Sequence, residues 1–463
     1  MKKITKLFLA AGMFVAAAGL ILSSCTKEGP QGASGTNGKN GENGTNGADA
    51  NETCKQCHSP SMVDKVATEF ELAKHSWGTV AFEEAGVIGC DPCHTSKGFV
   101  YVCKNNIPST FTFTGGKWVN NYSSIDAEAI GAINCWTCHT SLHTTYGAAD
   151  LALTTTAAVP MTMWGGAKTI DLTQDSGRSN LCVKCHQPRP LTCGNDPAGR
   201  LLNYDSVKNF PNVVMYDSTA GAHNIYLKPS YRMHIHYGAI GGVYAGMGAI
   251  EFPGSLAYSN SKHTTVASCP DCHMAEPMTG MAGGHAFNVR NAKESALGSG
   301  TTWNFNGCNV TDCHAADPLS KTAPLWVNTR NTVKGLLDAL ATAINAAGGG
   351  TDILHKEASS ANLWWGISTG NYDGYLDIYS SSTNPAGYWR DPYGSGSTNA
   401  GKPKFPSLSF AQTGAIINFQ FCLREYSLGI HNTKYVTALL TNTAGALTAA
   451  NLANRVALNR AGR

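Results

Sequence analysis

Charged residues are scarce in this sequence. Asp, Glu, Lys and Arg make up 14% of its 463 residues and the formal net charge is +3, whereas soluble domains carry about a quarter of charged residues. Without a cluster of positive charge, the chain is not expected to bind nucleic acid. After residue 22 it has no apolar run long enough to cross a membrane, which excludes a protein with several membrane-spanning helices. The hydrophobic share of 42% excludes a wholly disordered chain.

Common enzyme motifs are missing as well. The sequence has no Gly-x-Gly-x-x-Gly loop, no Walker loop and no Gly-x-Ser-x-Gly elbow, so nothing in it indicates a nucleotide-binding enzyme or a serine hydrolase. What it has instead is 16 Cys and 15 His. The question is therefore what these side chains bind.

Residues 1–24 predict a signal peptide of the lipoprotein type. Three Lys within the first six residues precede an apolar stretch from Leu7 to Leu22, in the order of a positive n-region and an h-region. The next residues, Leu22-Ser23-Ser24-Cys25, resemble a bacterial lipobox, in which the Cys is acylated and becomes the mature N-terminus. We expect lipidation of Cys25. The alternative is an ordinary signal peptide with a chance Cys.

The residues after Cys25 bear on the location of the protein. Cys25 is followed by Thr26 and Lys27, and not by the Asp that would retain a lipoprotein at the inner membrane. We expect an outer-membrane lipoprotein of the cell envelope, exposed at the surface and touching the membrane through its lipid anchor alone. A shuttle facing the periplasm, or a subunit of a larger complex, is the alternative.

A collagen-like spacer completes residues 25–50. Seven Gly-X-Y triplets run from Gly29 to Asp49, with Pro30 as their only proline. So little proline favours a flexible, hydrated stalk over a short trimerising triple helix.

Five segments fit Cys-x-x-Cys-His, the motif that attaches c-type haem, and a sixth has four residues between its cysteines. Chance would give about 0.02 copies in a chain of this composition. In chain order the motifs comprise Cys54, Cys57 and His58; Cys90, Cys93 and His94; Cys135, Cys138 and His139; Cys182, Cys185 and His186; Cys269, Cys272 and His273; and Cys308, Cys313 and His314.

Each motif predicts one covalently bound haem. Two thiols can form thioethers to the vinyl groups of a haem, and the adjacent His becomes the proximal iron ligand. Zinc sites and disulfides are the alternatives, but neither needs a His after every second Cys. We therefore expect six haems c, or five if the longer sixth motif binds none.

With these motifs the chain resembles the multihaem c-type cytochromes. Two flanking patterns add to the resemblance: Cys269-Pro-Asp-Cys272-His273-Met274 with His263 before it and Gly284-His285-Ala-Phe287 after it, and Gly429-Ile430-His431-Asn432 followed by Tyr435. The resemblance implies a mainly α protein with extensive loops and little β structure. Its residues 51–320 would be organised around stacked haems, and a haem-free helical region, residues 321–463, would pack on them.

The remaining histidines are candidates for the distal iron positions. Six of the nine would complete bis-His ligation, and the set we favour is His75, His143, His236, His263, His285 and His431. The resemblance ranks His263, His285 and His431 highest. His223 and His234 are reserves, and His355 is expected to bind no iron. Met ligation by Met274, Met278 or Met281 is the rival, and it would raise the potential of the fifth haem.

This supply of ligands favours electron transfer over catalysis. Multihaem reductases leave one iron open, and one group of them has Cys-x-x-Cys-Lys, which is absent here. Residues 54–314 provide about 43 residues per haem, so neighbouring haems should lie close together. The expected partners are other redox proteins or an extracellular acceptor, and self-association into filaments stays open. The alternative is an oxidoreductase acting on a small nitrogen or sulfur compound at one open haem.

Three cysteines and the C-terminal region lie outside the motifs. Cys103 and Cys193 could form a disulfide, or could stay thiols like Cys422. Apolar spacing predicts a helix from Thr332 to about residue 347, a second from Pro406 to Leu423 and a short third after Asn432, with residues 366–400 as loops. This region could cap the haems, with His431 adding a ligand. A separate binding domain with exposed Trp364, Trp365 and Trp389 is the weaker interpretation.

Overall fold

The computed structural model describes residues 59–77, 87–114, 117–124, 131–191, 202–212, 233–278, 282–291, 302–346, 353–356, 372–376, 378–381, 384–389 and 408–461. The chain divides into two units, Met1–Ala50 and Asn51–Arg463, and all described residues belong to the second. The predicted signal peptide, Cys25 and the Gly-X-Y spacer therefore lie outside the described residues, as do the first motif, Cys193, His223 and Met281.

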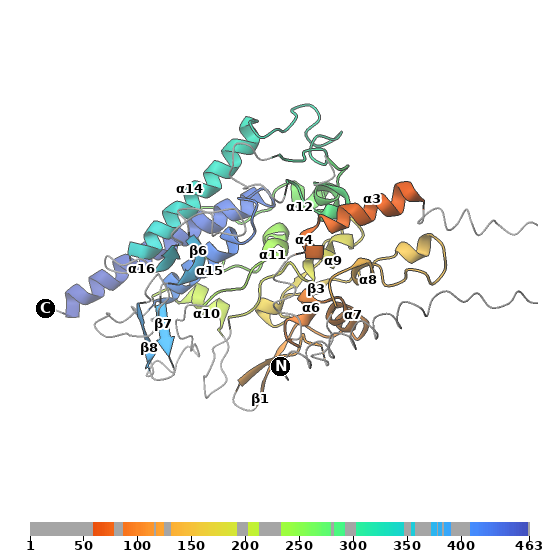
Figure 1. Cartoon of the computed structure of the whole chain (residues 1–463). Coiled ribbons are helices and arrows are strands. Elements are labelled where there is room, and N and C mark those ends of the chain that lie inside the picture. The colour runs from red at the N-terminus through yellow and green to blue at the C-terminus, as the bar shows by residue number, and fades with distance from the viewer. Residues whose placement is uncertain are drawn as a thin grey trace, which may run out of the picture. The chain divides into compact units, whose positions relative to one another are not determined.

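Short elements and irregular chain make up the described residues between 59 and 323 (Figure 1). The helices of this part are α3 (Pro60–Glu71), α4 (Lys74–Trp77), α6 (Asp91–His94), α7 (Ser96–Lys104), α8 (Cys135–Cys138), α9 (Arg178–Val183), α10 (Tyr204–Asn209), α11 (Ile240–Ala245), α12 (His263–Val266) and α13 (Cys269–His273). Three 3-10 turns, η1 (Ala148–Leu151), η2 (Thr162–Trp164) and η3 (Gly284–Ala286), lie among them. The strands are β1 (Phe111–Thr114), β2 (Lys117–Asn120), β3 (Val159–Pro160) and β4 (Thr169–Ile170), and they pair antiparallel as β1–β2 and β3–β4.

The three long helices follow at the C-terminal end. They are α14 (Pro324–Ala346), α15 (Phe410–Leu423) and α16 (Thr433–Ala461), and each packs against the other two (Figure 1). Between α14 and α15 lie β5 (Leu354–Lys356), β6 (Tyr372–Leu376), β7 (Ile378–Ser381) and β8 (Asn384–Trp389), paired as β5–β6 and β7–β8. The described chain is thus partly helical with little sheet, which confirms the coarse expectation of a mainly α fold.

Helix α15 is the centre of the apolar core. Its start is fixed by a capping box, in which the Ser409 hydroxyl accepts from the Gln412 amide and the Gln412 side chain accepts from the Ser409 amide. Thirteen of its 14 residues are buried, as expected of a helix surrounded by packing partners on all sides. The core around it draws Met163, Ile235 and Phe252 from the middle of the chain, together with residues of α14 and α16.

Three local predictions for this region were wrong in part. The first helix begins at Pro324, eight residues before Thr332, because proline at the first helical position is compatible with a helix start. The helix after Asn432 is not short but spans 29 residues, since its Ala-, Leu- and Asn-rich sequence contains no proline. Residues 366–400 are not wholly loop, because β6, β7 and β8 fall within them.

Buried amides connect α15 to distant parts of the chain. The Asn418 side chain accepts from the Ile250 amide at 2.9 Å and donates to the Ile250 carbonyl at 2.7 Å and to Thr443 Oγ1 at 2.8 Å. Gln420 donates to the carbonyls of Met233 and Gly374. These bonds supply partners to main-chain groups that are buried away from solvent. They also fix how α15 lies against the middle of the chain.

Replacing Asn418 by Ala tests this connection. The variant leaves both main-chain groups of Ile250 without their partner, so we expect the free energy of unfolding to fall by about 2–4 kcal/mol. Urea denaturation followed by far-UV circular dichroism measures the loss. The control is Asn331→Ala on the exposed side of α14, which should change stability by less than about 0.5 kcal/mol. Equal midpoints for the two variants would contradict the role given to Asn418.

Candidate cofactor centres

The described motifs share one closed turn. In the second, third and fourth motifs the amide of the His donates to the carbonyl of the first Cys, with N–O distances of 3.1, 2.9 and 3.0 Å. The same bond closes the sixth motif, from His314 N to Cys308 O at 3.0 Å. The two extra residues of that motif loop out, helped by Asp312 at a φ of 70°. The longer motif therefore keeps the relation between its first Cys and its His.

Side-chain caps hold two of these turns in place. Asn134 caps α8, with its amide donating to Thr137 Oγ1 and its side chain accepting from Trp136 N. Ser268 and Asp271 form the corresponding box on α13. Short helices of four or five residues are not stable alone, so these caps position the motif cysteines.

Four motif histidines each lie opposite a histidine from outside the motifs. The distances between ring centres are 5.9 Å for His75 and His186, and 6.2 Å for each of the other three pairs. Those pairs are His94 with His236, His263 with His314, and His273 with His431. Each pair joins distant parts of the chain.

These distances fit two axial ligands of one iron. A metal–imidazole nitrogen bond is about 2.0 Å and the nitrogen lies roughly 1.1 Å from its ring centre, so two rings binding one metal from opposite sides have centres about 6.2 Å apart. All four pairs lie within a few tenths of an ångström of this value. The residues present therefore fit a haem iron with two imidazole ligands.

His139 and His285 lie close enough to interact electrostatically. Burial is the larger cause that lowers the pKa of His285, and the charge of His139 adds to it. Glu69 is largely buried, and its Oε2 accepts the His285 amide at 2.9 Å and lies 3.9 Å from His285 Nδ1. Helix α3, which carries Glu69, packs against η3, which carries His285.

The other predicted ligands have different surroundings. His143 has a φ of 63° and lies against the rings of Trp136 and Tyr146. The turn after it is organised by the Asp150 carboxylate, which accepts bonds from Thr144, Thr145 and Tyr146 that lower its pKa to about 2. His58, which would serve the first haem, is outside the described residues.

The reserve His234 and the excluded His355 are both engaged elsewhere. The Nδ1 of His234 accepts the His236 amide at 2.9 Å, and its ring lies against Tyr375. His236, not His234, is the member of this pair that lies opposite a motif histidine. His355 is buried and its Nδ1 lies 2.7 Å from Asp373 Oδ2.

Burial favours the neutral form of four of the eight paired imidazoles, whereas the Glu425 carboxylate raises the pKa of His431 against the effect of burial. Burial is the largest cause that lowers the pKa of His186 to about 3, with His75 adding to it, and it lowers the pKa of His236 to about 3 and that of His273 to about 4. Burial also lowers the pKa of His75. A neutral imidazole is the form that binds a metal ion, since the protonated ring has no free lone pair.

The motifs are also close to one another. A hydrogen bond joins the thiols of Cys93 and Cys185, and each of these thiols also lies 3.8 Å from a carbonyl of the other motif. Further thiol hydrogen bonds join Cys182 to Cys269 and Cys272 to Cys308. The second, fourth, fifth and sixth motifs are thereby neighbours in that order.

The non-motif cysteines give no disulfide among the described residues. Cys103 is half-buried and Cys422 fully buried, and both are free thiols. Opposite His273 the structure places His431, so a histidine lies where Met274 or Met278 was the rival ligand.

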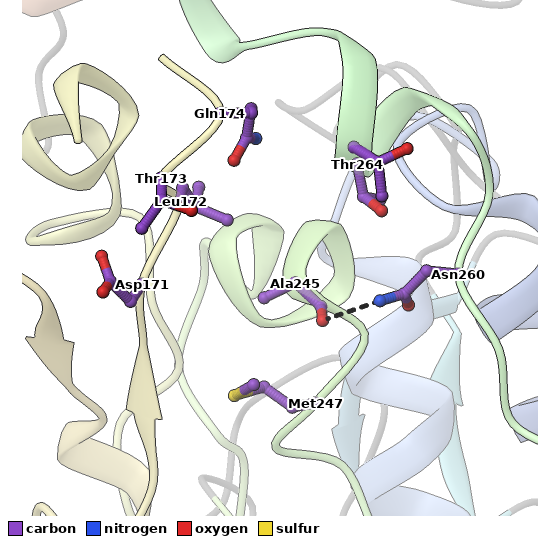
Figure 2. Close-up of a pocket in the computed structure, with 9 residues that line it drawn as sticks. Asp171, Leu172, Thr173, Gln174, Ala245, Met247, Asn260 and Thr264 are labelled. Atoms are coloured by element: carbon purple, nitrogen blue, oxygen red, sulfur yellow. Dashed lines mark hydrogen bonds between the residues drawn. The ribbon is translucent and has the colours of Figure 1, made fainter. Parts of the chain in front are cut away.

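A surface pocket of about 430 Å³ lies next to α12. Asp171, Thr173 and Gln174 line one side of it, and Asn260 and Thr264 line the other, with Asn260 donating to the Ala245 carbonyl (Figure 2). It contains no Cys or His, and we assign it no part in the candidate centres.

The groups that lie near Nδ1 of the candidate ligands could not be predicted from the sequence. Glu425 and Glu69, and the carbonyls of Phe287, Ile430 and Leu151, lie next to candidate ligands. Only Glu425 lies near its His in the sequence, and an acidic residue six positions before a His has no general meaning. These contacts became visible only with the fold.

Comparison with known proteins adds no relative. No family model, no curated protein and no solved structure matches the chain. Within the described ranges, no three His, Cys, Asp or Glu side chains gather as a metal-binding group, and no helix is long and apolar enough to span a membrane.

Counting haems tests whether the longer sixth motif attaches a haem as the other five are expected to do. We expect the variant Cys308→Ser/Cys313→Ser to carry five haems per chain where the unaltered protein carries six, because a haem without thioether bonds is lost on denaturation. Pyridine haemochrome absorbance against protein concentration measures both. Cys422→Ala, which removes a thiol outside the motifs, should keep six. Equal haem content in the double variant and the unaltered protein would contradict the assignment.

Proposed function

We propose that this protein transfers electrons through six covalently bound c-type haems. The observation that carries the proposal is the set of four ring pairs, in which a motif histidine faces a second histidine at 5.9–6.2 Å. When bound, each haem would supply an iron that alternates between the ferric and ferrous states. An iron with imidazole on both faces has no position for a substrate, which favours electron transfer over catalysis.

The residues of the chain have three tasks in this proposal. The motif cysteines would hold each haem by two thioethers, and the paired histidines would cap its iron. Main-chain carbonyls orient the rings, because Nδ1 of His139, His263 and His273 each lies 2.8–2.9 Å from one. A ring held through Nδ1 presents its other nitrogen to the metal.

The distribution of apolar residues supports haems as part of the core. Among the described residues, neither apolar cluster includes a member before Val159. The buried residues of that earlier part include polar ones such as Asp91 and Ser96, and its few buried apolar residues join neither cluster: Ala73, Phe99, Val102 and Tyr122. So little apolar packing suits a polypeptide that covers stacked porphyrins and uses their faces as core.

The neighbouring thiols support an order of transfer. Haems attached to the second, fourth, fifth and sixth motifs would follow one another along this series, because Cys93, Cys182 and Cys272 each contact a cysteine of the next motif. The third motif would join near the fourth, since the charge of Cys138 reaches both Cys182 and Cys185.

For its location we propose the outer envelope, with Cys25 lipidated and the Gly-X-Y spacer extending the haem-bearing part away from the membrane. The partners would then be other cytochromes or an extracellular electron acceptor. An oxidoreductase that acts on a small nitrogen or sulfur compound is the alternative outcome of the test below.

Spectroscopy of the purified protein tests the closed irons. We expect the ferric protein to show low-spin EPR signals alone, and the reduced protein to bind no carbon monoxide, because the proposal gives each iron a histidine on both faces. As a control, His236→Ala should open one iron in six, giving a high-spin signal and binding one carbon monoxide per chain. A high-spin centre in the unaltered protein, with turnover of nitrite or hydroxylamine, would replace electron transfer by catalysis.

A further inference from the structure

A buried carboxylate lies directly behind one candidate ligand. The Glu425 side chain has no exposed surface, and its Oε2 lies 2.6 Å from His431 Nδ1. The same carboxylate accepts from the Gly429 amide at 2.8 Å and from Ser427 Oγ at 2.5 Å. Three donors on one buried carboxylate stabilise its charged form.

This contact differs from those of comparable ligands. His139, His263 and His273 direct Nδ1 at a neutral main-chain carbonyl, whereas His431 directs it at a negative charge. Glu69 is the nearest parallel, but it lies 3.9 Å from Nδ1 of His285, beyond hydrogen-bond distance. Among these five described ligands, His431 alone has a hydrogen-bonded carboxylate.

The charges around Glu425 leave this effect in place. Arg330 is close enough to interact electrostatically with Glu425, but it lies over the rings of Trp303 and Trp326. The adjacent Arg424 donates to the carbonyls of His236 and Asp373 and lies over Tyr237 and Tyr375. Among the groups described as donating to the Glu425 carboxylate, the His431 ring is the one that would bind a metal.

We propose that Glu425 gives the haem of the fifth motif a lower reduction potential than the haem of the sixth motif, whose candidate ligand His263 has Nδ1 on a main-chain carbonyl. A carboxylate hydrogen-bonded to Nδ1 gives the imidazole anionic character and makes it a stronger donor to the metal. A stronger, more negative ligand stabilises ferric over ferrous iron, which lowers the potential. This inference rests on the proposed function. Glu425 is a positioning residue that acts through His431.

The experiment is a potentiometric titration of the purified holoprotein, followed optically and by EPR. In Glu425→Gln the side chain keeps its shape and an acceptor oxygen but loses its charge, so one midpoint should move to higher potential and one low-spin signal should shift. Glu69→Gln is the matched control and should move a different midpoint by less. Glu425→Asp, which keeps the charge, should lie between Gln and the unaltered protein.

The assignment to the fifth motif needs a variant of its own. In His431→Ala one low-spin signal should disappear, and in the unaltered protein this signal should be reduced after the signal that is lost in His263→Ala. This measurement does not depend on the folding of the Glu425 variants. If the signal lost in His431→Ala is reduced before the one lost in His263→Ala, or if Glu425→Gln with six haems titrates like the unaltered protein, the inference is overturned. Absence of haem from the unaltered protein would instead overturn the proposed function.

Discussion

In the proposed function the structure has to meet one geometric requirement: two imidazoles must lie on opposite sides of each iron, with ring centres about 6.2 Å apart and their outer nitrogens held by hydrogen bonds. No local element of the chain can meet it, because the two rings must point at each other from opposite sides. In each pair the rings come from segments far apart in the sequence, such as His94 and His236 or His273 and His431. The fold therefore has to be specified by contacts other than those of the ligands themselves.

Those contacts are concentrated in the C-terminal region. Helix α15 is buried on all sides, and its Asn418 and Gln420 bind the main chain at Ile250 and Met233. The Asn432 side chain, at the start of α16, donates to the carbonyls of Val243 and Tyr244. Through these bonds the helical region fixes segments that carry His236, His263 and His431. A region without haem motifs is thus a large part of what positions the candidate ligands.

The motifs and the candidate distal histidines could be listed from the sequence, but not which rings lie near each other; the structure brings four of those candidates, His75, His236, His263 and His431, within 5.9–6.2 Å of a motif histidine. The Cys-x-x-Cys-His spacing is local, so its closed turn follows from neighbouring residues, and α15 follows from its cap and apolar run. Helix α14 was predicted eight residues too short, because Thr332 is a good cap on paper whereas the helix continues through it to Pro324. Pairings such as His75 with His186 could not be predicted, since they depend on how segments without periodic patterns cross. His223 and the first motif fall on residues that the structure does not describe.

Because of the order of the motifs, the charge on Glu425 would affect electron transfer along the whole series of haems and not the fifth haem alone. The fifth motif uses Cys269 toward the fourth and Cys272 toward the sixth, so in the proposed function its haem lies inside the series. A centre of low potential at such a position is an energy barrier, and each 1.4 kcal/mol of it slows passage by about tenfold. The barrier slows transfer equally in both directions, so it sets a rate without choosing a direction. The direction must then come from the potentials at the two ends, and so from the donor and acceptor that the protein meets.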